Sequence, residues 1–169
     1  MVLRDGATVH VRRAGAADTP ALRRFLEGVS LDSLSQRFFG VPDLDQTARS
    51  FAAASGPEDL ALVAEHGSPP AIVAHAAWFG VGPRRAEVAC LVTDGWQGRG
   101  VGSLLVSRLA EAAQRGGIAT LVAEVRAGNR GMIAVFERAG YPVELRSVGG
   151  VVAVRIDTTR RLASMPRAA

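Results

Sequence analysis

The sequence contains no lysine, because all 20 of its Lys and Arg residues are arginines. A Walker phosphate loop ends in Gly-Lys-Ser/Thr, so this absence excludes ATP or GTP binding on such a loop. Cys90 is the single cysteine, which excludes a disulfide framework and a cysteine-based metal site. The three histidines, His10, His66 and His75, lie too far apart in the sequence to form a metal signature, and we expect no metal.

Aromatic residues and long apolar runs are also scarce. Only 5% of the residues are aromatic, and the arginines are scattered, so we expect no nucleic-acid partner despite the formal net charge of +4. No apolar run reaches the roughly 18 residues of a membrane-spanning helix, and the first residues lack the apolar region of a signal peptide. We therefore predict no membrane association and, by default, a cytoplasmic protein.

At 169 residues and 48% hydrophobic, the chain has the size and apolar content of one domain. Alternating or continuous apolar segments predict strands, and apolar residues at helical spacing predict helices. The expected strands are 8–12, 60–65, 71–79, 85–92, 120–125, 143–147 and 151–156; the expected helices are 20–29, one or two within 31–54, 101–115 and 130–139. We expect residues 1–157 to form the domain and 158–169 to form a basic, flexible tail.

The segment Gln97-Gly98-Arg99-Gly100-Val101-Gly102 follows a predicted strand and precedes a predicted helix. The first N–H groups of a helix have no partner within the helix and lie at the positive end of its dipole, so they attract an anion. Glycines there allow a diphosphate to approach the backbone. The spacing does not fit Gly-x-Gly-x-x-Gly, because Ser103 occupies the third glycine position. An ordinary tight turn is the alternative interpretation.

Gln97, Gly100 and Gly102 match the pattern Gln/Arg-x-x-Gly-x-Gly/Ala, which resembles the acyl-CoA pyrophosphate loop of the GNAT superfamily of N-acetyltransferases. The later segment from Asn129 to Tyr141 is similar to the Asn, apolar helix, Gly-aromatic sequence of the same family. The order of predicted elements also fits this family along nearly the whole chain. The resemblance implies an α/β (α+β) GNAT fold: a mixed, largely antiparallel sheet of about seven strands with a splayed parallel pair, flanked by about four helices.

The same resemblance implies acetyl-CoA as co-substrate. The residues expected to contact it are Leu91, Val92, Gln97, Gly98, Arg99, Gly100, Val101, Gly102, Ser103, Asn129, Met132 and Phe136. For Phe136 plain core packing is an equal alternative, and Asn129 also suits a helix N-cap. Many family members carry a tyrosine at the position of Phe136 that protonates the departing thiolate. No hydroxyl is available there, and we expect Tyr141 to pack in the core, so the general acid is unassigned.

Acetyl transfer to an amine requires the neutral amine, so a base is needed. Glu87 shares a strand face with Ala89 and Leu91, and a carboxylate among apolar neighbours loses hydration and becomes a better proton acceptor. Its position resembles that of the glutamate base in protein lysine acetyltransferases of this superfamily. The alternatives are a solvated ion pair with Arg84 or Arg85, and proton transfer through a water.

The segment Ser30-Leu31-Asp32-Ser33-Leu34-Ser35-Gln36-Arg37-Phe38-Phe39 resembles a stretch of bacterial Pat-type protein lysine acetyltransferases. We expect protein lysine as the acceptor, with Arg37 and Phe39 as candidate substrate contacts, although a structural role for Arg37 is slightly favoured. A small-molecule amine acceptor is one alternative. A catalytically silent acyl-CoA-binding module is another. We expect a monomer or a homodimer.

Overall fold

The computed structural model describes residues 1–3, 5–54 and 59–162. It contains seven strands, five α-helices and two short 3-10 helices. In chain order these are β1 (His10–Arg13), η1 (Ala16–Asp18), α1 (Thr19–Glu27), α2 (Leu31–Phe38), α3 (Leu44–Ala53), β2 (Asp59–His66), β3 (Ala71–Gly82), β4 (Arg85–Val92), η2 (Asp94–Trp96), α4 (Val101–Arg115), β5 (Thr120–Arg126), α5 (Arg130–Glu137), β6 (Val143–Val148) and β7 (Val151–Asp157).

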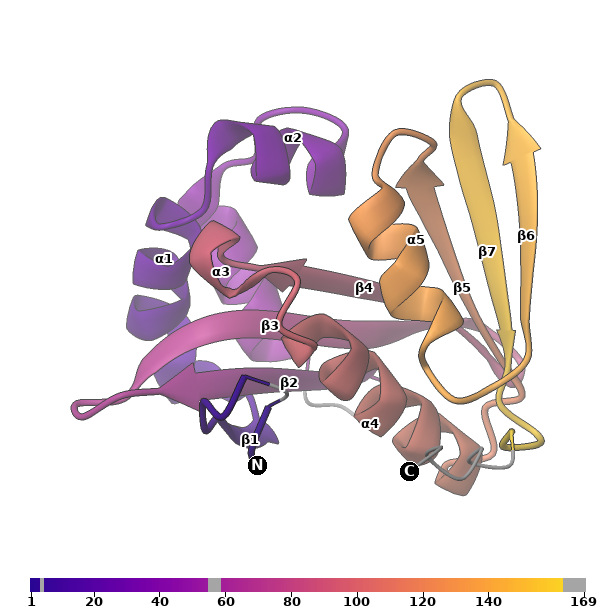
Figure 1. The fold of residues 1–169 in the computed structure, drawn as a ribbon, viewed down its shortest axis with the longest axis horizontal. Coiled ribbons are helices and arrows are strands. Elements are labelled where there is room, and N and C mark those ends of the chain that lie inside the picture. Colours follow the sequence, from indigo (N-terminus) through magenta and orange to yellow (C-terminus); the bar gives the residue numbers. More distant parts are fainter. Residues whose placement is uncertain (4, 55–58, 163–169) are drawn as a thin grey trace.

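All seven strands form one sheet in the order β1-β2-β3-β4-β5-β7-β6. Every neighbouring pair is antiparallel except β4 and β5, as expected for two strands joined by the crossover helix α4. Helices α4 and α5 lie in front of the sheet in Figure 1. Helices α1 and α3 pack on the opposite face of the β2–β4 part. The sheet is therefore the middle layer of the domain over its first half.

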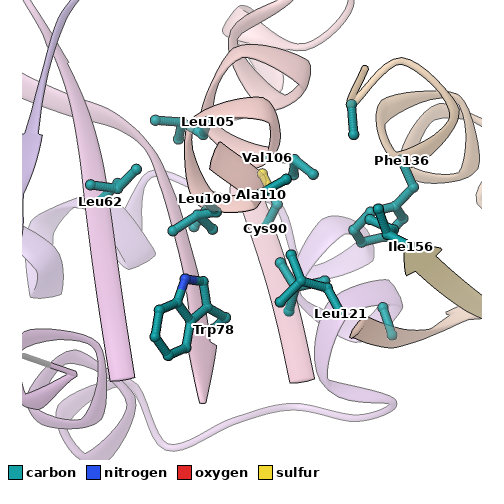
Figure 2. Packing of buried hydrophobic residues seen from close by; sticks show 14 of the residues in the cluster. Leu62, Trp78, Cys90, Leu105, Val106, Leu109, Ala110, Leu121, Phe136 and Ile156 are labelled. Carbon is teal, nitrogen blue, oxygen red and sulfur yellow. The ribbon is translucent and has the colours of Figure 1, made fainter. Parts of the chain in front are cut away.

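Two apolar clusters hold these layers together. The larger one joins α4 and α5 to one face of the sheet, and Figure 2 shows Leu105, Val106, Leu109 and Ala110 of α4 near Cys90 and above Trp78 and Leu121. The smaller one joins α1 and α3 to the other face through residues such as Leu26, Phe51 and Val63. Because both faces of the central strands are buried, these strands are continuous apolar runs in the sequence.

The parallel pair is short and then opens. Strands β4 and β5 pair only through Arg85 with Thr120, Ala86 with Leu121 and Glu87 with Val122. Beyond Glu87, β4 continues to Val92 paired with β3, and β5 continues to Arg126 paired with β7. The two facing edges therefore diverge, which confirms the splayed parallel pair predicted from the family resemblance.

The segment 31–54 forms two separate helices, the larger of the two numbers expected, which brings the α-helices of the described residues to five. The expected tail starts too early, because the Thr158 side chain is fully buried and its hydroxyl donates to the Ile118 carbonyl. Leu162 N–H also donates to the Gly140 carbonyl at 2.9 Å. The remainder of that tail, 163–169, lies outside the described residues. No helix in the described ranges is long and apolar enough to cross a membrane.

Candidate functional site

Two cavities meet at the point where the sheet opens. The first has a volume of about 320 Å³ and is lined by α2, the diverging parts of β4 and β5, the glycine turn and α5. The second, of about 970 Å³, lies over β5, β7 and β6 beside the end of α2. Four residues line both cavities, namely Arg37, Glu87, Ala123 and Glu124. A ligand in one cavity can therefore contact a ligand in the other next to Glu87.

The glycine turn needs its glycines for backbone reasons. Gly98 and Gly100 have φ values of +72° and +93°, which L side chains rarely adopt, and an added Cβ would meet no atom within 4 Å at either residue. Both glycines line the first cavity. The turn thus presents bare backbone to open space, as a diphosphate ligand requires.

Helix α4 starts at this turn without a side-chain cap. In contrast, α2, α3 and α5 are capped by Ser30, Asp43 and Asn129, each of which accepts a backbone N–H of the first turn. The first N–H groups of α4 are therefore left for another acceptor, and Val101, Gly102 and Ser103 all line the first cavity. This local chemistry fits the pyrophosphate group of an acyl-CoA.

Close packing is a further constraint on Gly102, beside the cofactor contact that we expect there. Gly102 is buried, and an added Cβ would lie 3.1 Å from Val135 Cγ2, 3.5 Å from Val92 Cγ2 and 3.6 Å from Cys90 Sγ. An added Cβ would thus press on Val135 of α5 and would lie at ordinary contact distance from β4. The glycine is required because the start of α4 packs closely against both elements.

The other residues of the turn differ in where their side chains point. Gln97 lines the first cavity, and its Nε2 donates to the Val92 carbonyl at 3.2 Å. Arg99 does not line it; its guanidinium lies 4.0 Å from the Trp96 ring centroid and pairs with the carboxylate of Asp5. The contact that we expect between Arg99 and the cofactor stays a prediction.

Helix α5 forms the opposite wall. Asn129 caps this helix by accepting the Met132 N–H at 3.0 Å, and Asn129, Met132 and Phe136 all line the first cavity. Phe136 is only 1% exposed and belongs to the main core, so its ring both packs in the core and borders the cavity. Tyr141 is also 1% exposed, and its hydroxyl donates to Gln114 Oε1 at 3.1 Å. Core packing of Tyr141 was predicted correctly.

On β4, Leu91 and Val92 are buried residues that line the first cavity, and Glu87 is the last residue paired with β5. Glu87 is exposed, so the low hydration that we expected from its apolar strand neighbours is wrong. Glu87 forms no ion pair with Arg84 or Arg85 among the pairs found in the described residues. Its carboxylate is therefore available to a ligand in either cavity.

Arg37 of α2 lines the same two cavities as Glu87 and lies near enough for the two charges to interact. Burial lowers the pKa of the Arg37 guanidinium, while the negative charge of Glu87 acts in the opposite direction. The guanidinium also lies 4.9 Å from the ring centroid of Phe38. Of the two candidate substrate contacts, Arg37 lines both cavities, whereas Phe39 lines only the second and is 44% exposed.

The floor of the second cavity is a row of four residues in register, three of which are charged. Glu87 pairs with Val122, Val122 with Arg155, and Arg155 with Glu144, so these four residues lie side by side across β4, β5, β7 and β6. The Arg155 and Glu144 side chains form an ion pair at 3.5 Å. The row is accessible because α1 and α3 cover only the other half of this sheet face.

Glu124 was missed by the sequence analysis. It follows Val122 by two residues on β5, so it lies on the same sheet face as Glu87, one step further into the opening. It is exposed and lines both cavities. The signal was available in the strand alternation of 120–126, because the predicted parallel pairing places Glu124 next to the candidate base.

The parallel strands β4 and β5 separate beside the uncapped helix α4 and its glycine turn. This arrangement is typical of a protein that binds an acyl-CoA between two diverging strands. Comparison with known families agrees with this class. The family model described as acetyltransferase (GNAT) family matches residues 29–141. The chain therefore belongs to this family and is an acyltransferase.

The GNAT domain of PAT from S. lividans is similar over most of both chains. The identity is 34% with a TM-score of 0.82, and the match covers 93% of this chain and 94% of the other. A cAMP-binding acyltransferase from Mycobacterium smegmatis is 24% identical, with a TM-score of 0.64 and coverage of 95% and 46%. The structure of yncA, a putative acetyltransferase from Salmonella typhimurium with its cofactor acetyl-CoA, is 19% identical, with a TM-score of 0.71 and coverage of 95% and 99%. The last two similarities show the shared fold alone.

Proposed function

We propose that this protein transfers an acetyl group from acetyl-CoA to the ε-amino group of protein lysines, with Glu87 as general base. The observation that carries the proposal is the position of Glu87 at the last paired position of β4, where it lines both cavities. The thioester enters from the first cavity and the amine from the second. The two reactants then meet beside the carboxylate.

In this proposal the pyrophosphate of acetyl-CoA binds the start of α4, and its pantetheine arm runs between the open edges of β4 and β5. The unpaired backbone groups of those edges are suitable partners for the pantetheine amides. Bound acetyl-CoA supplies the thioester carbonyl that the amine attacks. Glu87 accepts the proton that the amine loses, directly or through one water, and the carbon–sulfur bond then breaks. The CoA thiolate leaves without a hydroxyl donor from Phe136, because a thiol is already acidic compared with an alcohol.

The second cavity supports a lysine acceptor. Glu144 on its surface is paired with Arg155, but Glu87 and Glu124 form no ion pair among the described residues and can contact a cationic amine. The lining also holds the arginines Arg37, Arg85 and Arg146, and Phe39 and Val81 offer apolar surface to an aliphatic stem. Its volume of about 970 Å³ accommodates residues on either side of the lysine. The segment Ser30–Phe39, which resembles a stretch of bacterial Pat-type protein lysine acetyltransferases, also favours this acceptor class.

The test is acetyl transfer measured against a panel of lysine-containing proteins and small amines. We expect mass spectrometry to detect ε-acetylated lysines on at least one protein, at a rate that depends on the enzyme. Efficient turnover of a small amine without any acetylated protein would show that the acceptor is a small-molecule amine and not a protein lysine. Tight acetyl-CoA binding without turnover of any acceptor would favour the silent binding module.

A further inference from the structure

Helix α2 spans the opening of the sheet. Its residues Asp32, Ser33, Gln36 and Arg37 line the first cavity, and the next two residues line the second. At its C-terminal end, the ring centroid of Phe39 lies 5.2 Å from the guanidinium carbon of Arg126, the last residue of β5. At its N-terminal end, it meets the loop that follows β4. Figure 1 shows α2 beside the gap between β4 and β5. The position of α2 therefore determines where Arg37 lies.

Apolar packing holds this helix only weakly. Leu34 is the one buried residue of α2, whose residues are all described, and Leu31 is 71% exposed. In contrast, α1 and α3 each bury three residues in the smaller core. Polar contacts must therefore contribute a larger share of the anchoring of α2 than they do for α1 and α3.

Those polar contacts converge on Asp94, the first residue of η2. Its carboxylate accepts the Ser30 N–H at 2.9 Å, the Ser30 hydroxyl at 2.8 Å and the Ser33 hydroxyl at 2.9 Å. Ser30 is also the N-cap of α2 and accepts the Ser33 N–H at 3.2 Å. A carboxylate at this end of a helix is further favoured by the helix dipole. These hydrogen bonds lower the pKa of Asp94, so it is ionised at neutral pH.

The same contacts reach the cofactor turn. The Ser33 hydroxyl donates to Asp94 and accepts from Gln97 Nε2 at 3.1 Å, and the same nitrogen donates to the Val92 carbonyl. Ser33 thus connects the carboxylate to a residue of the glycine turn. One hydrogen-bonded group joins α2, the end of β4 and the loop between them.

We propose that Asp94 is a positioning residue that holds α2 across the sheet opening, so that Arg37 stays opposite Glu87 when the acceptor binds. This inference rests on the proposed function for its kinetic consequence. Its structural part, the anchoring of α2 by Asp94, is independent of any activity. Asp94 also lines the first cavity, so the test must separate its effect on α2 from a direct effect on CoA binding.

The matched pair of variants is Asp94→Ala and Asp43→Ala. Asp43 caps α3 by accepting the Gln46 N–H at 2.9 Å, so it is a carboxylate with a comparable local role on a helix that lines neither cavity. Hydrogen–deuterium exchange is measured on both proteins and on the parent chain. We expect amides 31–38 to exchange roughly tenfold faster in Asp94→Ala with 44–53 unchanged, and the reverse in Asp43→Ala. Unchanged exchange of α2 in Asp94→Ala would overturn the anchoring.

Steady-state kinetics and calorimetry then test the consequence. In Asp94→Ala we expect kcat/KM for the acceptor to fall about tenfold, and the Kd of CoA to change by less than about threefold. Asp94→Asn keeps one acceptor oxygen, so its kcat/KM for the acceptor should lie between the values of Asp94→Ala and the parent chain. An equal loss of CoA affinity and acceptor kcat/KM would show that Asp94 acts on the cofactor turn and not through α2. If the parent chain acetylates no acceptor, the proposed function fails, while the exchange result still decides whether Asp94 holds α2.

Discussion

Replacing Glu87 by Gln keeps the shape of the side chain at the apex of the opening and removes its ability to accept a proton. Glu87 is exposed and borders both cavities, so Gln fits without a cavity or a clash. The glycine turn, which is the proposed CoA site, lies elsewhere in the first cavity and should keep its geometry. We therefore expect a loss of rate with CoA affinity nearly unchanged.

The size of the loss follows from the acceptor. A lysine amine has a free pKa of about 10.4, so roughly one molecule in 2,500 is neutral at pH 7. If Glu87 takes the proton from the protonated amine, the small neutral fraction no longer limits the rate. Loss of the Glu87 carboxylate then slows transfer by at most about three orders of magnitude, or about 4 kcal/mol, which is within the usual range for general-base catalysis. The exposure of Glu87 admits water, which can substitute in part. We expect a loss of about 10²–10³-fold at pH 7.

Raising the pH should restore the rate of the variant. The neutral fraction of the amine increases about tenfold per pH unit below its pKa, so log kcat/KM of Glu87→Gln should rise with a slope near 1 between about pH 7 and 9. The parent enzyme should show a flatter profile over the same range. CoA release can be followed with a thiol reagent, because Cys90 is 2% exposed and burial raises its pKa to about 12.

Glu124→Gln is the matched control, since Glu124 is exposed and lines the same two cavities. It should retain most of the rate and the pH profile of the parent enzyme. A near-normal rate of Glu87→Gln at pH 7 would remove Glu87 from the mechanism. If Glu124→Gln instead shows the slow, pH-dependent transfer, the base is Glu124.

Further outcomes are expected. Gly100→Ala should weaken CoA binding in calorimetry and cost about 1–2 kcal/mol of stability, whereas Gly117→Ala, at a φ of +78° with equally open space, should lose only stability. Burial lowers the pKa of His75 from 6.5 to about 3, so the stability it contributes is complete above pH 6.5 and is lost as the pH falls towards 3. Between pH 7 and 5 this should amount to about 2 kcal/mol in urea unfolding, and His75→Gln should lack that component. Incubation with acetyl-CoA alone should give no ε-acetylation of this lysine-free chain by mass spectrometry; acetylated side-chain amines would contradict this.

The sequence predicted the fold well because its strands have unambiguous patterns. The runs within 60–65, 71–79 and 85–92 are apolar on both faces, and the structure pairs them as one antiparallel meander. The boundaries of α2 and α3 were harder, since Gly40 and Pro42 indicate a break but not how many helices flank it. At the C-terminal end, Thr158 is a polar residue buried by a hydrogen bond to a distant carbonyl. No local pattern indicates such a contact.

The candidate site was predicted where a motif determines the backbone, and not where distant side chains meet. The turn at 97–103 has a local cause, because glycines at positive φ and an uncapped helix follow from adjacent residues. The orientation of Arg99 depends on Asp5, 94 residues earlier in the chain. The anchoring of α2 depends on Asp94, 64 residues after Ser30. Such contacts between remote segments are set by the fold.

The absence of lysine has a consequence for the charged contacts of the fold. In the described part of the chain, each ion pair uses an arginine, or His10, as its basic partner, including the pair of Arg12 with Asp18 at 2.7 Å. Acetylation of a lysine removes its charge and would break such a pair. The arginine guanidinium remains protonated and is not a comparable nucleophile. Arg37, placed beside the proposed reaction centre, therefore keeps its positive charge in the presence of the acetyl donor.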